Sequence, residues 1–494
     1  MTFHPTLKKI PNFTVLSRIV RKRNLAVWLV GGFLRDSLLG VDKFLSDFDF
    51  CVAKDTTSLA REFAKQIKAK CIVLDEEQES LRVIFKKNNR LYTYDFSRLR
   101  GKDLKEDLSL RDFSINTLAL SLNQKSPKLL DYYRAQEDLK RGWLRVVKRR
   151  VLADDPLRII RAFSLSANYS FKIQPKTLLA MAASKKLIKK VSPERLSEEL
   201  FKIFLSADSY QAVKLMDKLK IIDEVLPVIT KTRGVRQGGY HHLDVWKHSL
   251  ETLRQFELLY NRRLAKDNDS FNYLNQEVIY NRRRFQVIKL ACLLHDIGKP
   301  SAKKRLKKKT IFHTHEKIGS ELIDKLAERL RLSSREIEVL KKLIFWHLRP
   351  GYLADQSPPT RRAIYRFFRD TKEDGVAVII LSLSDWRATR GPLTDFYKRR
   401  KHEKIMLELI KAYFSENKRK PLVKLADGHM IMNRFKLKPS PLVGKLLRKI
   451  NEEQALGKIS TPKEALSLAK EIIENLPTRG RKDLSEPGSE KGGG

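Results

Sequence analysis

Residues 27–52 read VWLVGGFLRDSLLGVDKFLSDFDFCV, and the first part of the chain is organised around this segment. A short apolar run precedes Gly31 and Gly32, and a second apolar run contains Asp47 and Asp49. Because residues two apart in a strand point to the same face, these carboxylates are placed to share divalent cations. The glycines allow a ligand to approach the backbone, and the start of the following helix favours phosphate. Together these features indicate metal-assisted nucleotidyl transfer.

Either feature alone has an ordinary explanation. A Gly-Gly pair between a strand and a helix is usually only a turn, and paired aspartates usually form a solvated strand edge. The two features at this spacing are far more specific than either alone, so the rest of the chain has to decide between these interpretations.

Composition points to a polyanionic partner. The 494 residues suffice for several domains, and 101 Lys and Arg against 58 Asp and Glu give a net charge of +43. Nucleic acid is the expected partner; a membrane is not, because the longest apolar run, 376–383, is too short to span a bilayer. Three separated cysteines in apolar contexts and an N-terminus without an apolar signal region predict a cytoplasmic protein.

Hydrophobic periodicity changes part-way along the chain. Between residues 27 and 96, the strand-like runs VWLV, DFDFCVA, CIVL, RVIFKK and RLYTYDF surround the helical SLAREFAKQIKA. After about residue 108 such runs nearly vanish, apart from LRVV at 144–147, and helical periodicity takes over. The order predicts an α+β chain with a small mixed-sheet head followed by a long helical body.

Further polar residues extend the candidate site of the head. An adjacent strand could bring Asp95, in TYDF, beside the first two carboxylates, although a solvated strand end is an equal alternative. Two-metal phosphoryl chemistry uses two or three such carboxylates. In EDLSLRDFSINTLAL, Arg111 can pair with a phosphate and Asp112 can accept from a ribose hydroxyl. An ordinary surface ion pair between these two residues would give the same sequence pattern.

The segment ADDPLRIIRAFSLSANYSF, residues 153–171, offers groups that could read a base. Asp155 and Arg158 are three residues apart on one predicted helical face, with Pro156 in the first turn. A carboxylate beside guanidinium donors could hydrogen-bond the base edges of CTP and ATP. Taken alone, a plain ion pair is the favoured alternative. Arg161 could add a base or phosphate contact.

Histidines crowd into the second half. Seven of the 10 histidines fall between residues 241 and 347. His248 lies in a helical pattern, and His295, Asp296 and Asp385 end apolar helical runs. A lone buried histidine is usually a core residue, but repeated imidazoles and carboxylates at helix ends suit transition metals that activate water.

These motifs, in order, resemble the class II tRNA nucleotidyltransferase and poly(A) polymerase family, and the histidine pattern resembles the HD-domain phosphohydrolases. The resemblance covers about residues 25–475. It implies a polymerase-β-like nucleotidyltransferase head in which Mg²⁺ is held at the paired carboxylates. The roles that it implies in the head and neck are Mg²⁺ binding by Asp47 and Asp49 with Asp95 assisting, triphosphate binding by Gly31, Gly32 and Arg35, ribose binding by Arg111 and Asp112, and base recognition by Asp155, Arg158 and Arg161.

The HD resemblance implies a second metal site. His248, His295, Asp296 and Asp385 match the four ligand positions for a divalent transition metal. Three further residues are expected to assist as ligands or phosphate contacts: Lys299, His315 and His347. Homologues with such a complete set are similar to phosphatases and 2′,3′-cyclic phosphodiesterases.

The resemblance predicts five regions: head 1–148, neck 149–230, HD domain 240–410, RNA-binding tail 411–477 and disordered tail 478–494. The predicted activity is template-independent addition or repair of the 3′-terminal CCA of tRNA from CTP and ATP, with release of pyrophosphate. A poly(A) polymerase and partial CC-adding or A-adding enzymes are alternatives. From other classes, an HD phosphohydrolase with a degenerate head and a purely RNA-binding protein are the competing hypotheses.

Overall fold

The computed structural model describes residues 7, 9–41, 46–124, 128–306, 309–356, 358–417 and 423–475. The chain divides into two compact units, residues 1–228 with 328–331, and residues 229–327 with 332–494. None of the described helices combines the length and apolar character needed to cross a membrane. The predicted disordered tail, 478–494, lies outside the described residues.

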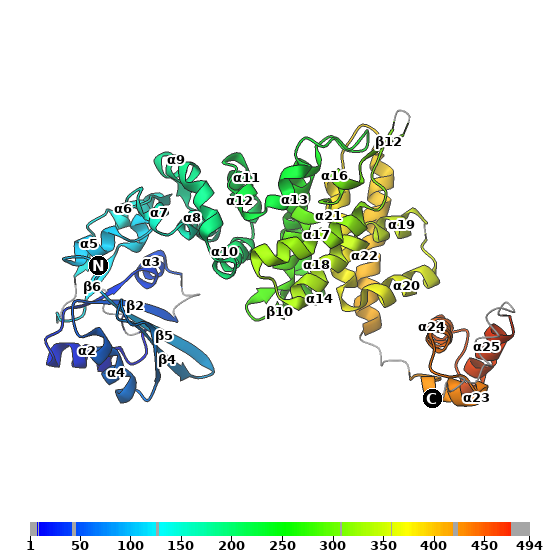
Figure 1. Ribbon diagram of the computed structural model, residues 1–494, viewed down its shortest axis with the longest axis horizontal. Helices are drawn as coiled ribbons and strands as arrows, with labels where there is room; N and C mark the ends of the chain where they lie inside the picture. Colours follow the sequence, from blue (N-terminus) through cyan, green and yellow to red (C-terminus); the bar gives the residue numbers. More distant parts are fainter. Residues whose placement is uncertain are drawn as a thin grey trace, which may run out of the picture. The chain divides into compact units, whose positions relative to one another are not determined.

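A mixed seven-stranded sheet forms the head, with strand order β3-β4-β5-β2-β1-β6-β7 (Figure 1). β2 pairs with β5 in parallel, whereas its other neighbour, β1, is antiparallel. The strands are β1 (Val27–Val30), β2 (Asp47–Val52), β3 (Lys70–Asp75), β4 (Ser80–Lys87), β5 (Arg90–Arg98), β6 (Ala119–Ser121) and β7 (Leu129–Leu130).

Because side chains alternate along a strand, β2 supplies residues both to the hydrophobic core and to the candidate site. Phe48 and Phe50 are 1% and 0% exposed, while Asp47 and Asp49, which alternate with them, are exposed. The two rings pack with Tyr94 of β5 and lie in one aromatic core with Phe63 of α4 (Thr56–Gln66). Burying each ring contributes about 2–3 kcal/mol, so the core fixes the register that turns the carboxylates to the other face.

Helices complete the head and build the neck, in which α8 packs against α10 and α11 (Figure 1). The remaining helices of the head are α2 (Phe13–Lys22), α3 (Gly32–Leu39), α5 (Leu104–Ser109), η2 (Ser114–Asn116) and α6 (Ala135–Arg141). Those of the neck are α7 (Val151–Asp154), α8 (Leu157–Tyr169), α9 (Pro175–Ser184), η3 (Lys185–Lys190), α10 (Pro193–Leu205), α11 (Ser209–Lys218) and α12 (Ile222–Val225).

Three local predictions for this unit were wrong. Two strands of the sheet, β6 and β7, follow residue 108, where strand-like runs were expected nearly to vanish; both are too short to show a clear period. Of the strand expected at 144–147, only Leu144 lies in a strand, Trp143–Leu144, which pairs with Lys172–Ile173. Asp155 is extended (φ −140°, ψ 96°) rather than helical, because the following proline disfavours helical backbone.

The second unit contains a helical body whose centre is apolar on all sides. In α15 (Arg284–Leu294) every residue is buried, and in α21 (Gly375–Ala388) residues 375–384 are buried, which marks both as interior helices. The other helices around them are η4 (Pro227–Thr232), α13 (Val245–Arg262), α16 (Lys299–Ala302), α17 (His315–Leu330), α18 (Ser334–Trp346), α19 (Arg349–Asp355), α20 (Arg361–Thr371), η6 (Lys372–Asp374) and α22 (Phe396–Asn417). Two short strands, β12 (Lys304–Leu306) and β13 (Lys309–Ile311), pair before α17.

The polar segment 261–284 packs onto this body. It forms η5 (Leu264–Lys266), α14 (Asn268–Asn275) and a hairpin of β10 (Glu277–Ile279) with β11 (Arg282–Arg283). The Tyr273 hydroxyl donates to the Glu373 carbonyl at 2.8 Å, and Arg282 pairs with Glu336 at 2.7 Å. The segment therefore braces the helical body from outside.

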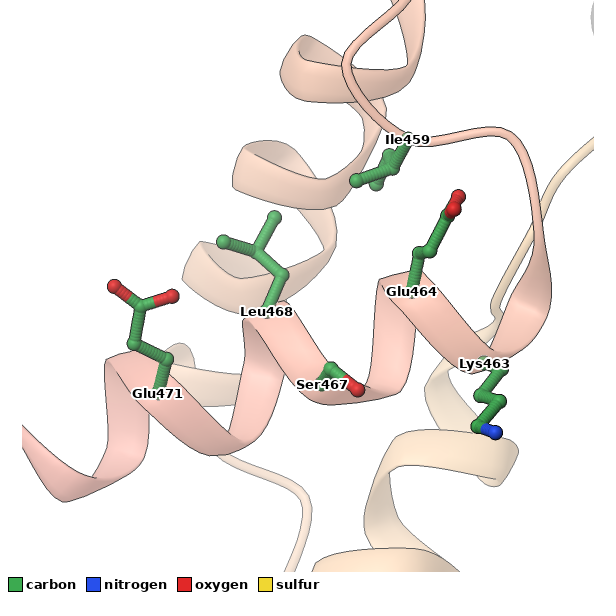
Figure 2. Close-up of a pocket in the computed structure, with 6 residues that line it drawn as sticks. All are labelled: Ile459, Lys463, Glu464, Ser467, Leu468 and Glu471. Carbon is green, nitrogen blue, oxygen red and sulfur yellow. The ribbon is translucent and has the colours of Figure 1, made fainter.

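The C-terminal tail consists of α23 (Gly428–Phe435), α24 (Pro441–Ala455) and α25 (Pro462–Glu474), with its own apolar core. Glu452 and Glu453 of α24 pair with Arg362 of α20 at 3.0 and 2.7 Å, and Arg366 adds two 2.9 Å bonds to Glu452. A pocket at α25, shown in Figure 2, is lined by Ile459, Lys463, Glu464, Ser467, Leu468 and Glu471. No predicted site residue lines it.

Candidate functional sites

The carboxylates of the head gather where β2 and β5 run side by side. Asp49 lies opposite Asp95, and Asp47 lies opposite Thr93, whose hydroxyl donates to the Asp47 carboxylate. The structure therefore brings the three predicted carboxylates to neighbouring positions of one sheet. The roles assigned to them remain predictions.

Asp95 has a partner that the sequence analysis did not identify. Arg82 of β4 lies opposite it and donates from Nε and NH2 to the two carboxylate oxygens at 2.8 and 2.7 Å. This bidentate geometry fixes Asp95 and balances one of three neighbouring negative charges. Asp47 and Asp49 are thus the carboxylates left facing solvent.

The chemical environment of Asp49 suits a cation. Although Asp49 is exposed by surface area, the protein surrounding its carboxylate raises its pKa; Arg111 opposes this effect, and Asp95 and Asp47 add to it. A carboxylate whose charged form is disfavoured by its neighbours gains from a bound cation. Mg²⁺ fits this site because it takes one or two carboxylates and leaves room for substrate phosphates.

Gly31 brings the backbone against this site. It lies between β1 and α3 with φ 81° and ψ −141°, a conformation essentially restricted to glycine. A Cβ added there would lie 3.0 Å from the Asp49 Oδ2 atom and 3.2 Å from Arg111 NH1. The absence of a side chain at Gly31 thus keeps the backbone, and a ligand approaching it, close to the carboxylates.

Arg35, predicted to bind triphosphate, is instead buried between the head and the neck. Its Nε donates to Asp36, NH1 to Asn116 and NH2 to the Tyr169 hydroxyl, each at 2.8 Å. The guanidinium carbon also lies 4.5 Å from the centre of the Tyr169 ring. These contacts tie α3 to η2 and to the end of α8, so Arg35 positions the helix that follows Gly31.

Arg111 lies behind the carboxylates. Its NH2 donates to the Cys51 sulfur at 3.2 Å, and its Nε is 3.7 Å from the buried Asp107 carboxylate. It is also close enough to Asp49 to oppose the rise that burial causes in the pKa of that carboxyl. Arg111 therefore supplies fixed positive charge to the site.

Asp112 sits in a network of donors. Its Oδ1 accepts from the backbone of Phe113 at 2.7 Å and from Asn116 at 2.9 Å, and Arg161 reaches Oδ2 at 3.3 Å. Burial would raise the pKa of Asp112, but Arg161 and these hydrogen bonds outweigh it and hold the pKa below its ordinary value. The network joins the predicted ribose-binding residue to α8, which carries Arg161.

In the neck, Asp155 and Arg158 are close but do not form the tight pair expected from their spacing. Their side chains are 4.0 Å apart, whereas Arg195 of α10 donates to Asp155 at 2.8 Å. Arg158 donates from NH1 to the carbonyl oxygens of Leu110 and Val151 at 2.9 and 3.2 Å. The extended backbone at Asp155 explains the difference, because it removes this residue from the helix that carries Arg158.

The second site lies among α13, α15, α17, α18 and α21. His248 of α13 contacts Asp385 of α21 at 2.7 Å, and the His295 Nε2 atom is 3.3 Å from Asp296 and 3.7 Å from Asp385. His248, His295 and Asp296 offer ligand atoms that all lie within 4.8 Å of one another. The four residues predicted as metal ligands are thus brought together.

A second group of possible metal ligands also includes Asp296. Its Oδ1 atom is 3.3 Å from His315 Nε2 and 3.8 Å from His347 Nε2, and the three residues form another set within 4.8 Å. The Nδ1 atoms of His315 and His347 lie 2.7 and 2.6 Å from the carbonyls of Phe312 and Ile344, and His295 Nδ1 is 3.0 Å from the Cys292 carbonyl. Donation from Nδ1 leaves each Nε2 free to bind a metal.

Unsatisfied buried atoms indicate that the cluster is built for cations. The Nε2 atoms of His295, His315 and His347 and the Oδ1 of Asp296 lack a hydrogen-bond partner among the described residues. Such orphaned groups are rare in native interiors. One or two transition metals would satisfy them, since imidazole and carboxylate are suitable ligands.

Two histidines of the cluster have pKa values that are shifted in opposite directions by their surroundings. Burial would lower the pKa of His295, but Asp296 and Asp385 raise it to about 10. Burial and the neighbouring His295 and His315 lower the pKa of His347 to about 3. A proton on His295 thus balances the carboxylates, a role that a metal ion would take over.

Lys299 and Gly298, in the segment HDIGKP, complete the site. The Lys299 ammonium donates to Asp296 and to Gln237, each at 2.6 Å. A Cβ at Gly298 would lie 2.1 Å from the His315 carbonyl oxygen, so only glycine allows α17 to begin beside His295. Gln237 was not identified from the sequence, because its helix-free segment carries no distinctive pattern.

Three family models match the chain. They are the poly A polymerase head domain at residues 27–145, the probable RNA and SrmB-binding site of polymerase A at 170–232, and the HD domain at 245–390. The A-adding tRNA nucleotidyltransferase of Deinococcus radiodurans is 31% identical over 456 residues, which cover 91% of this chain and 96% of the relative. The chain belongs to the class II tRNA nucleotidyltransferase and poly(A) polymerase family.

Other members extend the comparison. The CC-adding tRNA nucleotidyltransferase of Thermus thermophilus is 28% identical over 449 residues, covering 88% of this chain and 91% of that protein. The Thermotoga maritima CCA-adding enzyme complexed with tRNA has a TM-score of 0.64 at 18% identity, covering 96% of this chain and 99% of that one. A CCA-adding enzyme complexed with CTP reaches a TM-score of 0.66, also at 18% identity and the same coverage. The predicted family and α+β fold class are confirmed.

Proposed function

We propose that the head and neck catalyse nucleotidyl transfer to the 3′ end of tRNA, which adds or repairs all or part of its terminal CCA from CTP and ATP and releases pyrophosphate. The observation that carries this proposal is the face of β2, where Asp47 and Asp49 face solvent beside Asp95 and beneath the Gly31 turn. Family membership and relatives named as A-adding and CC-adding tRNA nucleotidyltransferases support the choice of tRNA. The proposed location is the cytoplasm.

In this proposal Asp47 and Asp49 hold Mg²⁺, which supplies activation of the attacking 3′-hydroxyl and neutralisation of phosphate charge. Gly31 and Gly32 bring the backbone close to the triphosphate. Arg111 adds fixed positive charge behind it, and Asp112 accepts from the ribose hydroxyl. Arg35 acts by holding α3 in place, since three hydrogen bonds already engage its guanidinium.

Base recognition falls to the neck. Asp155, Arg158 and Arg161 present an acceptor and two guanidinium groups along the start of α8, and Arg161 is tied to Asp112. To read a base edge, Arg158 would exchange its bonds to two backbone carbonyls for bonds to the nucleotide. Such an exchange conserves the number of hydrogen bonds and costs little net free energy.

The A-adding step is the proposed core of the activity. The relative named A-adding matches over nine-tenths of this chain at 31% identity, and complete CCA synthesis is the broader activity predicted from the sequence. CC addition is the second candidate function, favoured by the Thermus thermophilus relative.

A primer series separates these activities. Purified protein with Mg²⁺ receives tRNA ending before the CCA, after one C, or after CC, together with CTP, ATP or both, and products are resolved at single nucleotides. One A added to the CC-ending tRNA is the expected result. Addition of C, C and A to the shortest primer would establish complete synthesis. Long A tails would mean poly(A) polymerase, and addition of C alone would overturn the A-adding proposal.

We further propose that the HD domain, residues 240–410, is a metal-dependent phosphohydrolase. His248, His295, Asp296 and Asp385 would hold one divalent transition metal, and Asp296, His315 and His347 a second. The metals supply a nucleophilic water and stabilise phosphate charge. Lys299, bonded to Asp296, is placed to contact a phosphate.

The two activities are separable by substitution. Asp49→Asn should abolish nucleotide addition and leave phosphate release intact, whereas Asp385→Asn should do the reverse. Hydrolysis without nucleotide addition in the wild type would support an HD hydrolase with a degenerate head. RNA binding that survives both substitutions without any turnover by the wild type would mark a purely RNA-binding protein.

A further inference from the structure

Two buried side chains that are not among the predicted site residues hold Arg111 in the head. Cys51 of β2 and Asp107 of α5 are each 1% exposed. The Arg111 NH2 group donates to the Cys51 sulfur at 3.2 Å, and the Arg111 Nε atom lies 3.7 Å from the Asp107 carboxylate. These two contacts leave NH1 as the end of the guanidinium that lies at the Gly31 turn.

The position of Cys51 follows from the alternation of side chains along β2. Cys51 comes two residues after Asp49, so its side chain points to the same face of the sheet as that carboxylate. Unlike Asp49, it is covered, because it packs in an apolar cluster with Leu104 and Leu108 of α5. Cys51 therefore lies where the carboxylate face of β2 meets α5.

The thiol links the acid to the guanidinium. Its S–H group donates to the Asp107 Oδ2 atom at 3.4 Å, and its sulfur accepts from Arg111. Burial raises the pKa of Cys51 to about 11, with Arg111 opposing this rise and Asp107 adding to it. The group thus keeps its proton at neutral pH, and a thiol can donate to a carboxylate while it accepts from a guanidinium.

The bond to sulfur is the contact that orients Arg111. The Asp107 Oδ1 atom accepts from the backbone and the Nε atom of Arg100 at 3.1 and 3.4 Å, so another cation shares the charge of this carboxylate. In the part of the head that the structure describes, the buried Nε atom of Arg111 has no hydrogen-bond partner. A Cβ added at Gly31 would lie 3.2 Å from NH1, which places this group at the turn beside Asp49.

We infer that Cys51 is a positioning residue for the nucleotide triphosphate, because it holds Arg111 apart from Asp107 with NH1 at the Gly31 turn. This role rests on the proposed nucleotidyl transfer and adds to it the residue that orients the positive charge. Without a polar atom at residue 51, the guanidinium is free to close the 3.7 Å gap to Asp107. A direct ion pair there would neutralise charge that the triphosphate otherwise meets.

The test compares Cys51→Ala with Cys51→Ser in the full-length protein. Both substitutions remove the sulfur, but a serine hydroxyl can donate to Asp107 and accept from Arg111, whereas alanine can do neither. Initial rates are measured with Mg²⁺ and varied ATP on a tRNA ending in CC, or varied CTP on a tRNA that lacks the CCA. Cys51→Ala should raise KM for the nucleotide about tenfold and leave kcat within about threefold, because a bond to a charged group that binds substrate is lost. Cys51→Ser should keep both values within about threefold.

Cys71→Ala is the matched control in the same sheet. Cys71 of β3 lies opposite Val83, whose neighbour Arg82 faces Asp95, so the Cys71 side chain points to the face without the carboxylates. This variant should change neither KM nor kcat. An unchanged KM in Cys51→Ala would overturn the inference, as would a fall in kcat alone. An equal rise of KM in both Cys51 variants would also overturn it, because lost volume would then explain the effect.

If the wild type adds no nucleotide, the proposed transfer fails, and equilibrium dialysis with ATP and Mg²⁺ then decides on the role of Cys51. Binding that is weakened in Cys51→Ala and kept in Cys51→Ser supports that role. Equal binding by the wild type and both variants, equal weakening in both variants, or no binding by the wild type refutes it.

Discussion

Replacing Gly31 by alanine should damage the nucleotidyltransferase site far more than it damages the fold. The φ of 81° with ψ −141° is strained for any residue with a side chain, at a cost of about 1–3 kcal/mol. The new Cβ would also lie 3.0 Å from the Asp49 carboxylate and 3.2 Å from Arg111. Relief of that contact requires Asp49 to shift by several tenths of an ångström.

Displacement of a metal-binding carboxylate by this fraction of an ångström should lower nucleotide addition roughly 10-fold, since a misplacement by 1 Å can cost about 100-fold. The strain should lower the melting temperature by roughly 2–4 °C for each kcal/mol. Single-turnover addition to tRNA and calorimetry measure the two effects on the same preparation.

Gly444→Ala is the matched control. Gly444 lies within α24, and nothing lies within 4 Å of an added Cβ. Alanine should therefore leave nucleotide addition unchanged and stabilise the helix by about 0.5–1 kcal/mol. Full activity of Gly31→Ala would show that close approach of the backbone to Asp49 is unimportant.

Four further substitutions test other parts of the account. His347→Ala should reduce bound transition metal from two ions to one per chain by elemental analysis; an unchanged stoichiometry would contradict the shared role of Asp296. Arg82→Gln should release Asp95 and shift the Mg²⁺ concentration for half-maximal nucleotide addition at least threefold. An unchanged Mg²⁺ titration would argue that the bidentate contact of Arg82 with Asp95 does not affect the site. Asp155→Asn should change the ratio of ATP to CTP incorporation about tenfold while the melting temperature stays within a few degrees; an equal loss with both nucleotides would deny it a role in base choice. Asp112→Asn should destabilise the protein by about 1–3 kcal/mol at pH 7. Because the folded pKa of Asp112 lies below its ordinary value of 3.8, this difference should persist above about pH 4 and shrink as pH falls further, and a constant difference would disprove the coupling.

Much of the head was predictable from local pattern. The alternation of aspartate and phenylalanine in DFDF was sufficient to place the carboxylates on one face and the rings in the core. The Arg82 partner of Asp95 had a signal as well. Asn88 and Asn89 both have positive φ, so the two form a tight hairpin turn whose register puts residue 82 opposite residue 95.

Other parts depend on distant contacts. The parallel pairing that sets Asp49 opposite Asp95 joins separate segments, and no local period specifies it. The burial of Arg35 against Tyr169 and the pairing of Asp155 with Arg195 arise from packing of the neck on the head and of α10 on α8. The residue types at these positions can be read from the sequence, but their partners are determined by tertiary packing.

The histidine cluster was predictable from the sequence only in part. The resemblance to the HD-domain phosphohydrolases predicted one set of ligands, His248, His295, Asp296 and Asp385. The sharing of Asp296 with a second set became visible only when α17 and α18 were placed beside it. Side chains on several helices converge through packing, which sequence spacing does not encode.

The central claim is that the solvent-facing carboxylates of β2 drive nucleotide addition to tRNA. Its most direct test is a comparison of wild type and Asp49→Asn in a single-turnover assay with Mg²⁺, ATP and a tRNA ending in CC. We expect one added A by the wild type and at least a 1,000-fold slower reaction (roughly 4 kcal/mol) for the variant. Addition at an undiminished rate by Asp49→Asn, or no addition by the wild type, would contradict it.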